Sequence, residues 1–246
     1  MNDKDIRTQS RRGFLGAVAA VAATAAVGGL PLARGAAGRM KIGIIGSGRI
    51  GGTLGGLWAK AGHEVMFSSL DIEHDKALAA QHGPNARAGT SREAAAFGDV
   101  LLLAVPYRAV PQVGKDLASV LKGKIVIDAC NPFTARDGEI GTWAREKGAG
   151  LASAELLPGA RIVRAFNAVS AARLPDIAQS KGERTGMPIA GDDANAIAVA
   201  SRLIREVGFE PVVVGNLAMG RHLIPGTPLA GERSPDEIRR IAKTLS

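Results

Sequence analysis

A glycine-rich turn, placed between an apolar run and a helical pattern, constrains the fold of this chain more than any other feature. Lys41–Ile45 (KIGII) has the composition of a short buried strand, and Gly46–Gly51 follows with glycines in the spacing G-x-G-x-x-G. Apolar residues then recur at helical spacing over Ile50–Ala61, and His63–Phe67 has the pattern of a second strand. This strand–turn–helix–strand order predicts a dinucleotide-binding unit rather than a glycine-rich turn without a ligand.

Each glycine of the turn has a predicted physical task. Gly46 allows the tight turn, Gly48 removes a side chain so that the backbone can approach a pyrophosphate, and Gly51 lets the helix pack close to the strand. The pyrophosphate is then expected on the free N–H groups and the positive dipole end of the helix. The residues predicted to bind the cofactor at this turn are Gly46, Ser47, Gly48, Arg49, Ile50 and Gly51.

The segment before the first strand predicts export. Ser10–Leu15 (SRRGFL) resembles the twin-arginine motif S-R-R-x-F-L, with Gly16 where lysine is usual, and an Ala/Gly/Val-rich stretch runs to Leu32. Small residues at Gly35–Ala37 suit a signal peptidase, so we expect residues 1–37 to be a signal peptide that is cleaved near Ala37. The expected location is the periplasm, reached through the twin-arginine export machinery. An uncleaved membrane anchor is the alternative, although the many Ala and Gly residues make the stretch weakly apolar.

The export motif and the glycine turn are connected by one hypothesis. The resemblance to twin-arginine signals implies that the chain crosses the membrane already folded. Because dinucleotides are scarce outside the cytoplasm, we expect the protein to fold around its nucleotide first and to carry it along tightly bound.

Composition excludes several other classes of protein. The formal net charge is +8, of which about +5 belongs to residues 38–246, and it is spread out without a Lys/Arg run, so we expect no nucleic-acid binding. Cys130 is the only cysteine, which rules out an internal disulfide and a cysteine-cluster metal site. The four histidines show no ligand spacing, so no metal site is predicted.

Strand-like and helix-like segments alternate along the rest of the chain. Their order predicts an α/β fold, a Rossmann-type doubly wound parallel sheet with right-handed crossovers. We expect an NAD(P)-binding domain over residues 40–167 and a small C-terminal extension, residues 168–246, packed on the same sheet. Residues 133–150 are polar and Gly-rich, and we expect a loop with a short helix there. The further predicted strands are Ala86–Ala88, Asp99–Val105, Lys124–Ala129, Arg161–Phe166, Met187–Ala190 and Glu210–Val214.

In such sheets, ligands bind outside the carboxyl ends of the strands. Ser68 and Ser69 end the second predicted strand, and Val105 and Pro106 end the apolar run that starts at Asp99. We expect Val105 and Pro106 to lie against the cofactor. Asn131, which follows KIVIDAC, has an amide that can hold a ribose hydroxyl or the nicotinamide carboxamide. Simple termination of the strands is the alternative for these positions.

Taken together, the motifs resemble one known family, from about Met40 to Leu223. They are IGSGRIGGTLG, GHEVMFSS, the VPY strand end, DACNPF, RAFN, AGDDANA and GNLAMGRHL. In this order they are similar to the predicted dinucleotide-binding proteins related to NADPH:deazaflavin (coenzyme F-420) oxidoreductase. The resemblance implies that the protein binds NADP and passes a hydride to or from a flavin-like or deazaflavin-like ring. The same domain occurs in metalloreductases, fused to membrane helices.

One departure from the family pattern bears on the choice of cofactor. Relatives often have an arginine for the 2′-phosphate of NADP after the serine, where this chain has Leu70 and then Asp71. Ser68, Ser69 and Arg49 could still serve the phosphate, so NADP is favoured. Asp71 could instead accept a hydrogen bond from a ribose 2′-hydroxyl, which keeps NAD open, or it could cap the helix that follows.

The sequence offers no clear acid–base pair, which suits hydride transfer to a small planar acceptor. Arg221 and His222 are the weak catalytic candidates for a carbonyl substrate, with a surface or subunit contact as the alternative. Cys130 has no activating partner, so we expect a buried structural thiol. The predicted function is an exported NAD(P)-dependent oxidoreductase. Alternatives are a non-catalytic dinucleotide-binding protein and a carbonyl or ferric-chelate reductase; a homodimer is also plausible.

Overall fold

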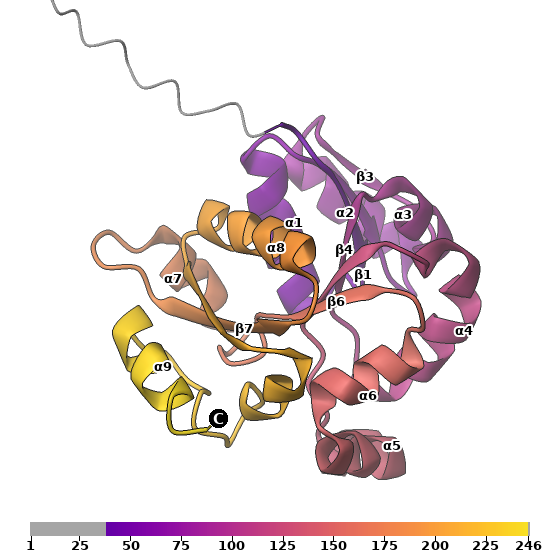
Figure 1. Ribbon diagram of the computed structural model, residues 1–246. Coiled ribbons are helices and arrows are strands. Elements are labelled where there is room, and N and C mark those ends of the chain that lie inside the picture. Colours follow the sequence, from indigo (N-terminus) through magenta and orange to yellow (C-terminus); the bar gives the residue numbers. More distant parts are fainter. Residues whose placement is uncertain (1–37, 246) are drawn as a thin grey trace, which may run out of the picture. The chain divides into compact units, whose positions relative to one another are not determined.

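A computed structural model describes residues 38–245, which fold as one compact unit (Figure 1). The predicted signal segment, residues 1–37, lies outside the described residues. Within residues 38–245, no helix combines the length and apolar character needed to cross a membrane.

A single sheet forms the middle layer of the described unit. It has eight strands in the order β3-β2-β1-β4-β5-β6-β7-β8. β1, at the centre of the first half, pairs in parallel with β2 on one side and with β4 on the other. The strands are β1 (Lys41–Ile45), β2 (Glu64–Ser68), β3 (Ala86–Ala88), β4 (Val100–Leu103), β5 (Ile125–Asp128), β6 (Arg161–Arg164), β7 (Gly186–Gly191) and β8 (Glu210–Gly215).

Helices cover both faces of the sheet, as the predicted doubly wound fold requires. One face packs against α1 (Arg49–Lys60), α2 (Ile72–His82), α7 (Leu174–Gln179) and α8 (Ala194–Glu206). The other packs against α3 (Ser91–Phe97), η1 (Tyr107–Ala109), α4 (Val110–Leu121), α5 (Thr134–Lys147), α6 (Ala149–Leu156) and η2 (Leu217–His222).

The buried indole of Trp58 fastens α1 to the far part of the sheet. Its Nε1 donates to Leu203 O of α8 at 3.0 Å, and its ring meets Phe166 edge to face at 6.2 Å. The ring of Phe166 also meets Phe209 edge to face. The helix that follows the glycine turn is therefore anchored by a backbone carbonyl of α8 and by the ring of Phe166.

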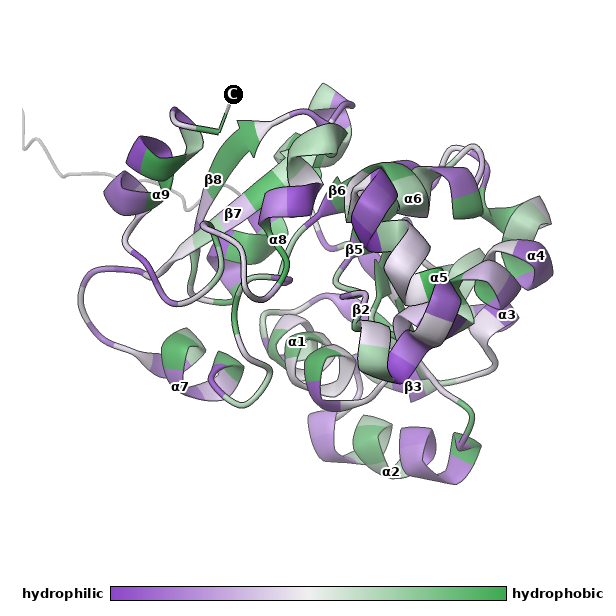
Figure 2. Ribbon diagram, turned by 90° about the horizontal axis from the view of Figure 1, so that it is seen from below, coloured by the Kyte–Doolittle hydropathy of each residue, from purple (hydrophilic) through white to green (hydrophobic). Residues whose placement is uncertain are grey.

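Local polar caps set several of the helix starts. Thr90 and Ser234 each form a capping box, at the starts of α3 and α9 (Pro235–Ala242), and Asp193 caps α8. α9 buries Ile238 in a small separate core with β7 and β8, and Figure 2 shows its other turns as largely hydrophilic.

Two expectations from the sequence were incomplete. β7 runs antiparallel to β6, so the sheet is mixed rather than wholly parallel, and β8 follows the direction of β7. Residues 133–150 are mainly helical instead of a loop with one short helix, since α5 occupies most of the segment and α6 begins at Ala149. Gly138, with φ +60°, puts a kink in α5, and this break explains why the segment lacks a continuous helical pattern.

Candidate functional site

The glycine turn has the geometry that its three glycines require. Gly46 has φ +98°, and the N–H groups of Gly46 and Ser47 donate to Ser68 O at 2.9 and 3.1 Å. A Cβ on Gly51 would lie 2.0 Å from Gly46 O, so only glycine lets α1 start this close to the turn. A Cβ on Gly48 would meet nothing within 4 Å, so the space above this residue is open to a ligand.

The N-terminus of α1 faces this open space without a side-chain cap. Its N-cap is Gly48, and its first turn contains no acidic residue. The first N–H groups of a helix have no partner within the helix, and the helix dipole makes this end attractive to anions. Backbone donors without a capping side chain, beside a glycine that leaves room, are suited to the pyrophosphate of a dinucleotide.

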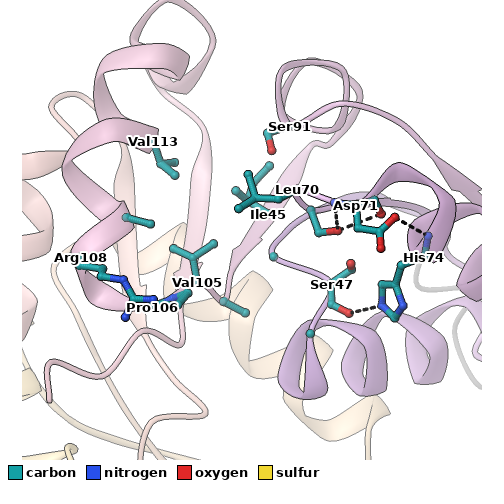
Figure 3. Close-up of a pocket in the computed structure, with 15 residues that line it drawn as sticks. Ile45, Ser47, Leu70, Asp71, His74, Ser91, Val105, Pro106, Arg108 and Val113 are labelled. Carbon is teal, nitrogen blue, oxygen red and sulfur yellow. Dashed lines mark hydrogen bonds between the residues drawn. The ribbon is translucent and has the colours of Figure 1, made fainter. Parts of the chain in front are cut away.

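A cavity of about 500 Å³ opens at this point, outside the carboxyl ends of β1 and β4. Figure 3 shows Val105, Pro106, Arg108 and Val113 on one side and Ser47, Leu70, Asp71 and His74 on the other. The cavity has the location expected for the ligand site of a doubly wound sheet. Its remaining lining residues are Ile45, Gly46, Gly48, Ser69, Ser91, Ala104 and Ala109.

A buried carboxylate ties together the two loops on the β2 side of the cavity. Asp75, in the first turns of α2, is 0% exposed and accepts hydrogen bonds from Ser47 Oγ and from Ser69 Oγ, the latter at 3.0 Å. Ser47 belongs to the glycine turn, and Ser69 belongs to the loop after β2. The position of one loop therefore depends on the other.

Asp71 caps α2, which was one of the two roles predicted for it. Its Oδ1 accepts from the N–H groups of Glu73 and His74 at 3.1 and 3.0 Å. His74 then brings its Nε2 to 3.4 Å from Ser47 O, so its ring stands at the cavity. Leu70 is fully exposed at 108% and lines the same wall.

Comparison with known proteins identifies the family of this chain. Residues 41–132 match the family model described as NADP oxidoreductase coenzyme F420-dependent. The F420-dependent NADP reductase of Methanothermobacter thermautotrophicus is 31% identical over 206 residues, covering 77% of this chain and 87% of that protein. This chain belongs to that family.

Two further likenesses fit the family. The metalloreductase STEAP3 of Rattus norvegicus is 31% identical over 186 residues, which cover 74% of this chain but only 35% of that longer protein. A hypothetical protein from Sinorhizobium meliloti, known from a crystal structure, superimposes with a TM-score of 0.65 at 27% identity, covering 80% of this chain and 96% of that one. The family model and the F420-dependent NADP reductase, together with the fold, establish an NADP-dependent oxidoreductase family.

The residues predicted for an NADP reductase of this family fall into two groups. Six of them line the cavity: Gly46, Ser47, Gly48, Ser69, Val105 and Pro106. The other cofactor candidates stand behind or beside it. Ser68 is buried and donates to Ile44 O at 2.6 Å, so its hydroxyl braces β1 instead of facing the cavity. Arg49, Ile50 and Gly51 form the first turn of α1, and Arg49 is exposed.

Asn131 lies one strand beyond the cavity lining, in a braced group at the ends of β5 and β6. Its Nδ2 donates to Asn167 O at 2.8 Å, and Asn167 Nδ2 donates back to Cys130 O at 3.3 Å. Both amide oxygens are buried without a hydrogen-bond partner within the described residues. Phe166, immediately before Asn167, has φ +64°, which is a strained conformation for a bulky residue.

An ion pair fully shielded from solvent supports this group from behind. Arg164 Nη1 donates to Asp128 Oδ2 and to Cys130 O, both at 2.7 Å, and both side chains of the pair are 0% exposed. Burial, together with the charge of Asp128, raises the pKa values of Cys130 and Tyr107, so both stay protonated. The Cys130 thiol is buried and free, in agreement with the structural role expected for it.

Arg221 and His222, the weak catalytic candidates, do not line the cavity. Arg221 Nη2 donates to Lys147 O at 3.3 Å, and burial, with a smaller effect of Arg221, lowers the pKa of His222. Arg221 lies against Gly148, at the junction of α5 and α6, and Gly220 beside it lies against Arg164 of β6.

Several cavity residues were missed at the sequence level, among them Leu70, His74, Arg108 and Val113. No spacing signal marks them, because they come from loops and first helical turns that the fold brings together. Within the described residues, no group of three or more His, Cys, Asp or Glu side chains could hold a metal ion.

Proposed function

We propose that the protein is an exported NADP-dependent oxidoreductase that transfers a hydride between nicotinamide and a flavin-like or deazaflavin-like acceptor. The observation that carries this proposal is the open glycine turn beside the uncapped N-terminus of α1, at the mouth of the cavity. The names of the F420-dependent NADP reductases that it resembles support both the cofactor and the deazaflavin acceptor.

The choice of NADP over NAD rests on the β2 side of the cavity. Asp71 is engaged as the cap of α2, which leaves it less suited to a ribose 2′-hydroxyl. Ser69 and His74 line this wall, and Arg49 is exposed nearby on the first turn of α1. We assign the 2′-phosphate to these groups, with His74 in part replacing the arginine that relatives carry at the position of Leu70.

The bound nicotinamide would supply the hydride chemistry, and the residues of this chain would bind and orient the reactants. Val105 and Pro106 offer an apolar, stiff surface for the nicotinamide half. Asn131 and Asn167 are on the strand ends beyond it, where their amides could meet a ribose hydroxyl or the carboxamide. Arg221 and His222 do not line the cavity, which disfavours a carbonyl substrate that needs a proton donor.

A ferric chelate is the second candidate acceptor. The similarity to metalloreductase STEAP3 favours it. Such an acceptor would take single electrons, so a flavin between nicotinamide and iron would have to split the electron pair.

Export is proposed from Ser10–Leu15 and from the small residues that end at Ala37. Mass spectrometry of nucleotide retained by protein purified from the periplasm tests export and loading together. NADP near one per chain is the expected result. An empty site in folded, exported protein would contradict loading before export, and retention of the whole protein in the membrane would favour the anchored alternative.

Turnover tests the reaction. We expect NADPH oxidation with at least one member of a panel of flavins, deazaflavins and ferric chelates. NADPH binding without turnover on any of them would leave the non-catalytic binding protein as the better explanation.

A further inference from the structure

An exposed aromatic ring with an arginine stacked on it lies in the segment between β5 and α5. The side chain of Phe133 is 39% exposed, although it is a large apolar group. The guanidinium carbon of Arg136 lies 4.9 Å from the centroid of that ring. A ring covered on one side by a cation and partly open to solvent is a surface on which another planar group can stack.

Asp137 joins this ring to the wall of the cavity. Its Oδ1 accepts from Arg108 N at 3.2 Å and from Arg136 Nε at 2.9 Å, and its Oδ2 accepts from Phe133 N at 2.9 Å and from Arg136 Nη2 at 2.8 Å. Arg108 also lines the cavity, on the same side as Pro106 (Figure 3). The segment that carries Phe133 and Arg136 is therefore held next to Arg108, at the rim of the cavity on the side that the proposed function gives to the nicotinamide half.

Positive charge exceeds negative charge around this rim. Three arginines donate to backbone carbonyls within residues 131–136: Arg136 to Asn131 O, Arg145 to Pro132 O and Arg108 to Arg136 O. Asp137 is the buried counter-charge of Arg108 and Arg136. Burial opposes its ionisation, but hydrogen bonds from Arg136 and from two backbone N–H groups lower its pKa, so it stays charged. The side chains of Arg108 and Arg136 are 55% and 39% exposed and can still meet an anion.

We propose that Phe133, Arg136 and Arg108 form an acceptor platform, which stacks the planar ring of the acceptor and selects acceptors that carry a negative group. This inference rests on the proposed function, because it concerns the second reactant of the same hydride transfer. Phe133 supplies the stacking surface for the ring. Arg108 and Arg136 supply donors for a phosphate or carboxylate.

FMN and riboflavin test the platform, since they share one ring system and differ in the phosphate. Binding of each is measured by quenching of flavin fluorescence, on the purified protein with and without NADP. We expect FMN to bind about threefold to tenfold more tightly than riboflavin at low salt, with the ratio falling towards one in 0.5 M salt. Equal binding of both flavins, or a ratio that is independent of salt, would overturn the charge selection.

Variants test which residues cause the preference for FMN over riboflavin. Arg108→Gln should reduce the ratio for FMN over riboflavin about threefold, and Arg136→Lys, which keeps a charge but loses the planar fork, should reduce it less. Phe133→Leu should weaken both flavins alike and leave their ratio unchanged. Arg240→Gln removes the same charge on α9 and should change neither flavin. A Phe133→Leu variant that binds both as the wild type does would exclude stacking on this ring.

The binding measurement separates this inference from the proposed function. Binding is recorded without turnover, so FMN preference in a protein that never oxidises NADPH would retain the platform and reject the reductase. NADPH oxidation with flavins that is unchanged in variants of Phe133, Arg108 and Arg136 would retain the reductase and reject the platform.

Discussion

The carboxyl ends of β1 and β4 and those of β5 and β6 lie on one edge of one sheet, yet they are built in opposite ways. At β1, polar backbone groups are left open, because the turn ends in glycines and α1 has no side-chain cap. At β5 and β6, polar side chains bond internally: Arg164 pairs with Asp128, and the amide nitrogens of Asn131 and Asn167 donate to backbone carbonyls, although both amide oxygens have no partner within the described residues. The comparison suggests that the first region is built to receive an anion, whereas the second is built to hold its own shape.

We call the ends of β1 and β4 the open region and the ends of β5 and β6 the closed region. The largest expected effect concerns the closed region. Arg164→Met would leave Asp128 as a buried charge without its partner, and we expect the free energy of unfolding to fall by about 3–5 kcal/mol in urea titrations. The double variant Arg164→Met/Asp128→Leu should recover part of this loss. A loss below about 1 kcal/mol for the single variant would show that the ends of β5 and β6 do not depend on the ion pair.

Two glycine variants in the open region distinguish a glycine that is needed for helix packing from a glycine that leaves room for a ligand. Gly51→Ala should cost about 1–3 kcal/mol of stability, because its Cβ would collide with Gly46 O. Gly48→Ala should leave stability nearly unchanged but weaken NADPH, since its Cβ enters only the open space. Thermal denaturation measures the stability of each variant, and calorimetric titration measures its affinity for NADPH. Undiminished NADPH affinity in Gly48→Ala would place the pyrophosphate elsewhere.

Introducing an arginine at Leu70 should increase the preference of the open region for NADP over NAD. Leu70→Arg is expected to raise the affinity for NADPH relative to NADH about tenfold at low salt, because Leu70 is fully exposed and lines the cavity. Leu151→Arg, on α6, is the matched control and should leave the ratio unchanged. If NADH tightened as much as NADPH, the wall at Leu70 would not hold the 2′-phosphate.

The smallest of the four expected effects is a loss of stability in acid at the rim that contains Asp137. The pKa of Asp137 is lowered in the folded protein, so the stability it contributes is fully present above the unfolded value of about 3.9 and is lost as the pH falls through the lower folded value. Asp137→Asn should flatten this part of the pH dependence in unfolding measured by circular dichroism. An unchanged profile would mean that other carboxylates cause the acid sensitivity.

Much of the open region could be read from the sequence, because local chemistry defines it. Glycine spacing, the strand and the helix of one βαβ unit lie within a few dozen residues, and the strand Ala86–Ala88 that follows was predicted with its observed bounds. The closed region could not be read in this way. Arg164 and Asp128 are 36 residues apart, and nothing local shows that their side chains meet.

The misjudged elements share a different cause. The glycines of residues 133–150 conceal two helices, since Gly138 kinks the first and Gly148 (φ +93°) separates it from the second. The direction in which β7 pairs with β6 depends on which strand edge is still free. The periodicity of apolar residues carries no information on strand direction. Residue periodicity likewise could not show that Arg221 and His222 do not line the cavity.

The two tryptophans of the chain divide between helices on opposite faces of the sheet. Trp58 is fully buried on α1, hydrogen-bonded to Leu203 O, whereas Trp143 is half-buried on α5 with Lys147 Nζ 5.6 Å from the centroid of its ring. Their emission should therefore differ in colour, blue-shifted for the first and red-shifted for the second. The protein thus carries two built-in optical reporters, one on the helix that begins at the glycine turn and one on the helix that begins at the acceptor platform.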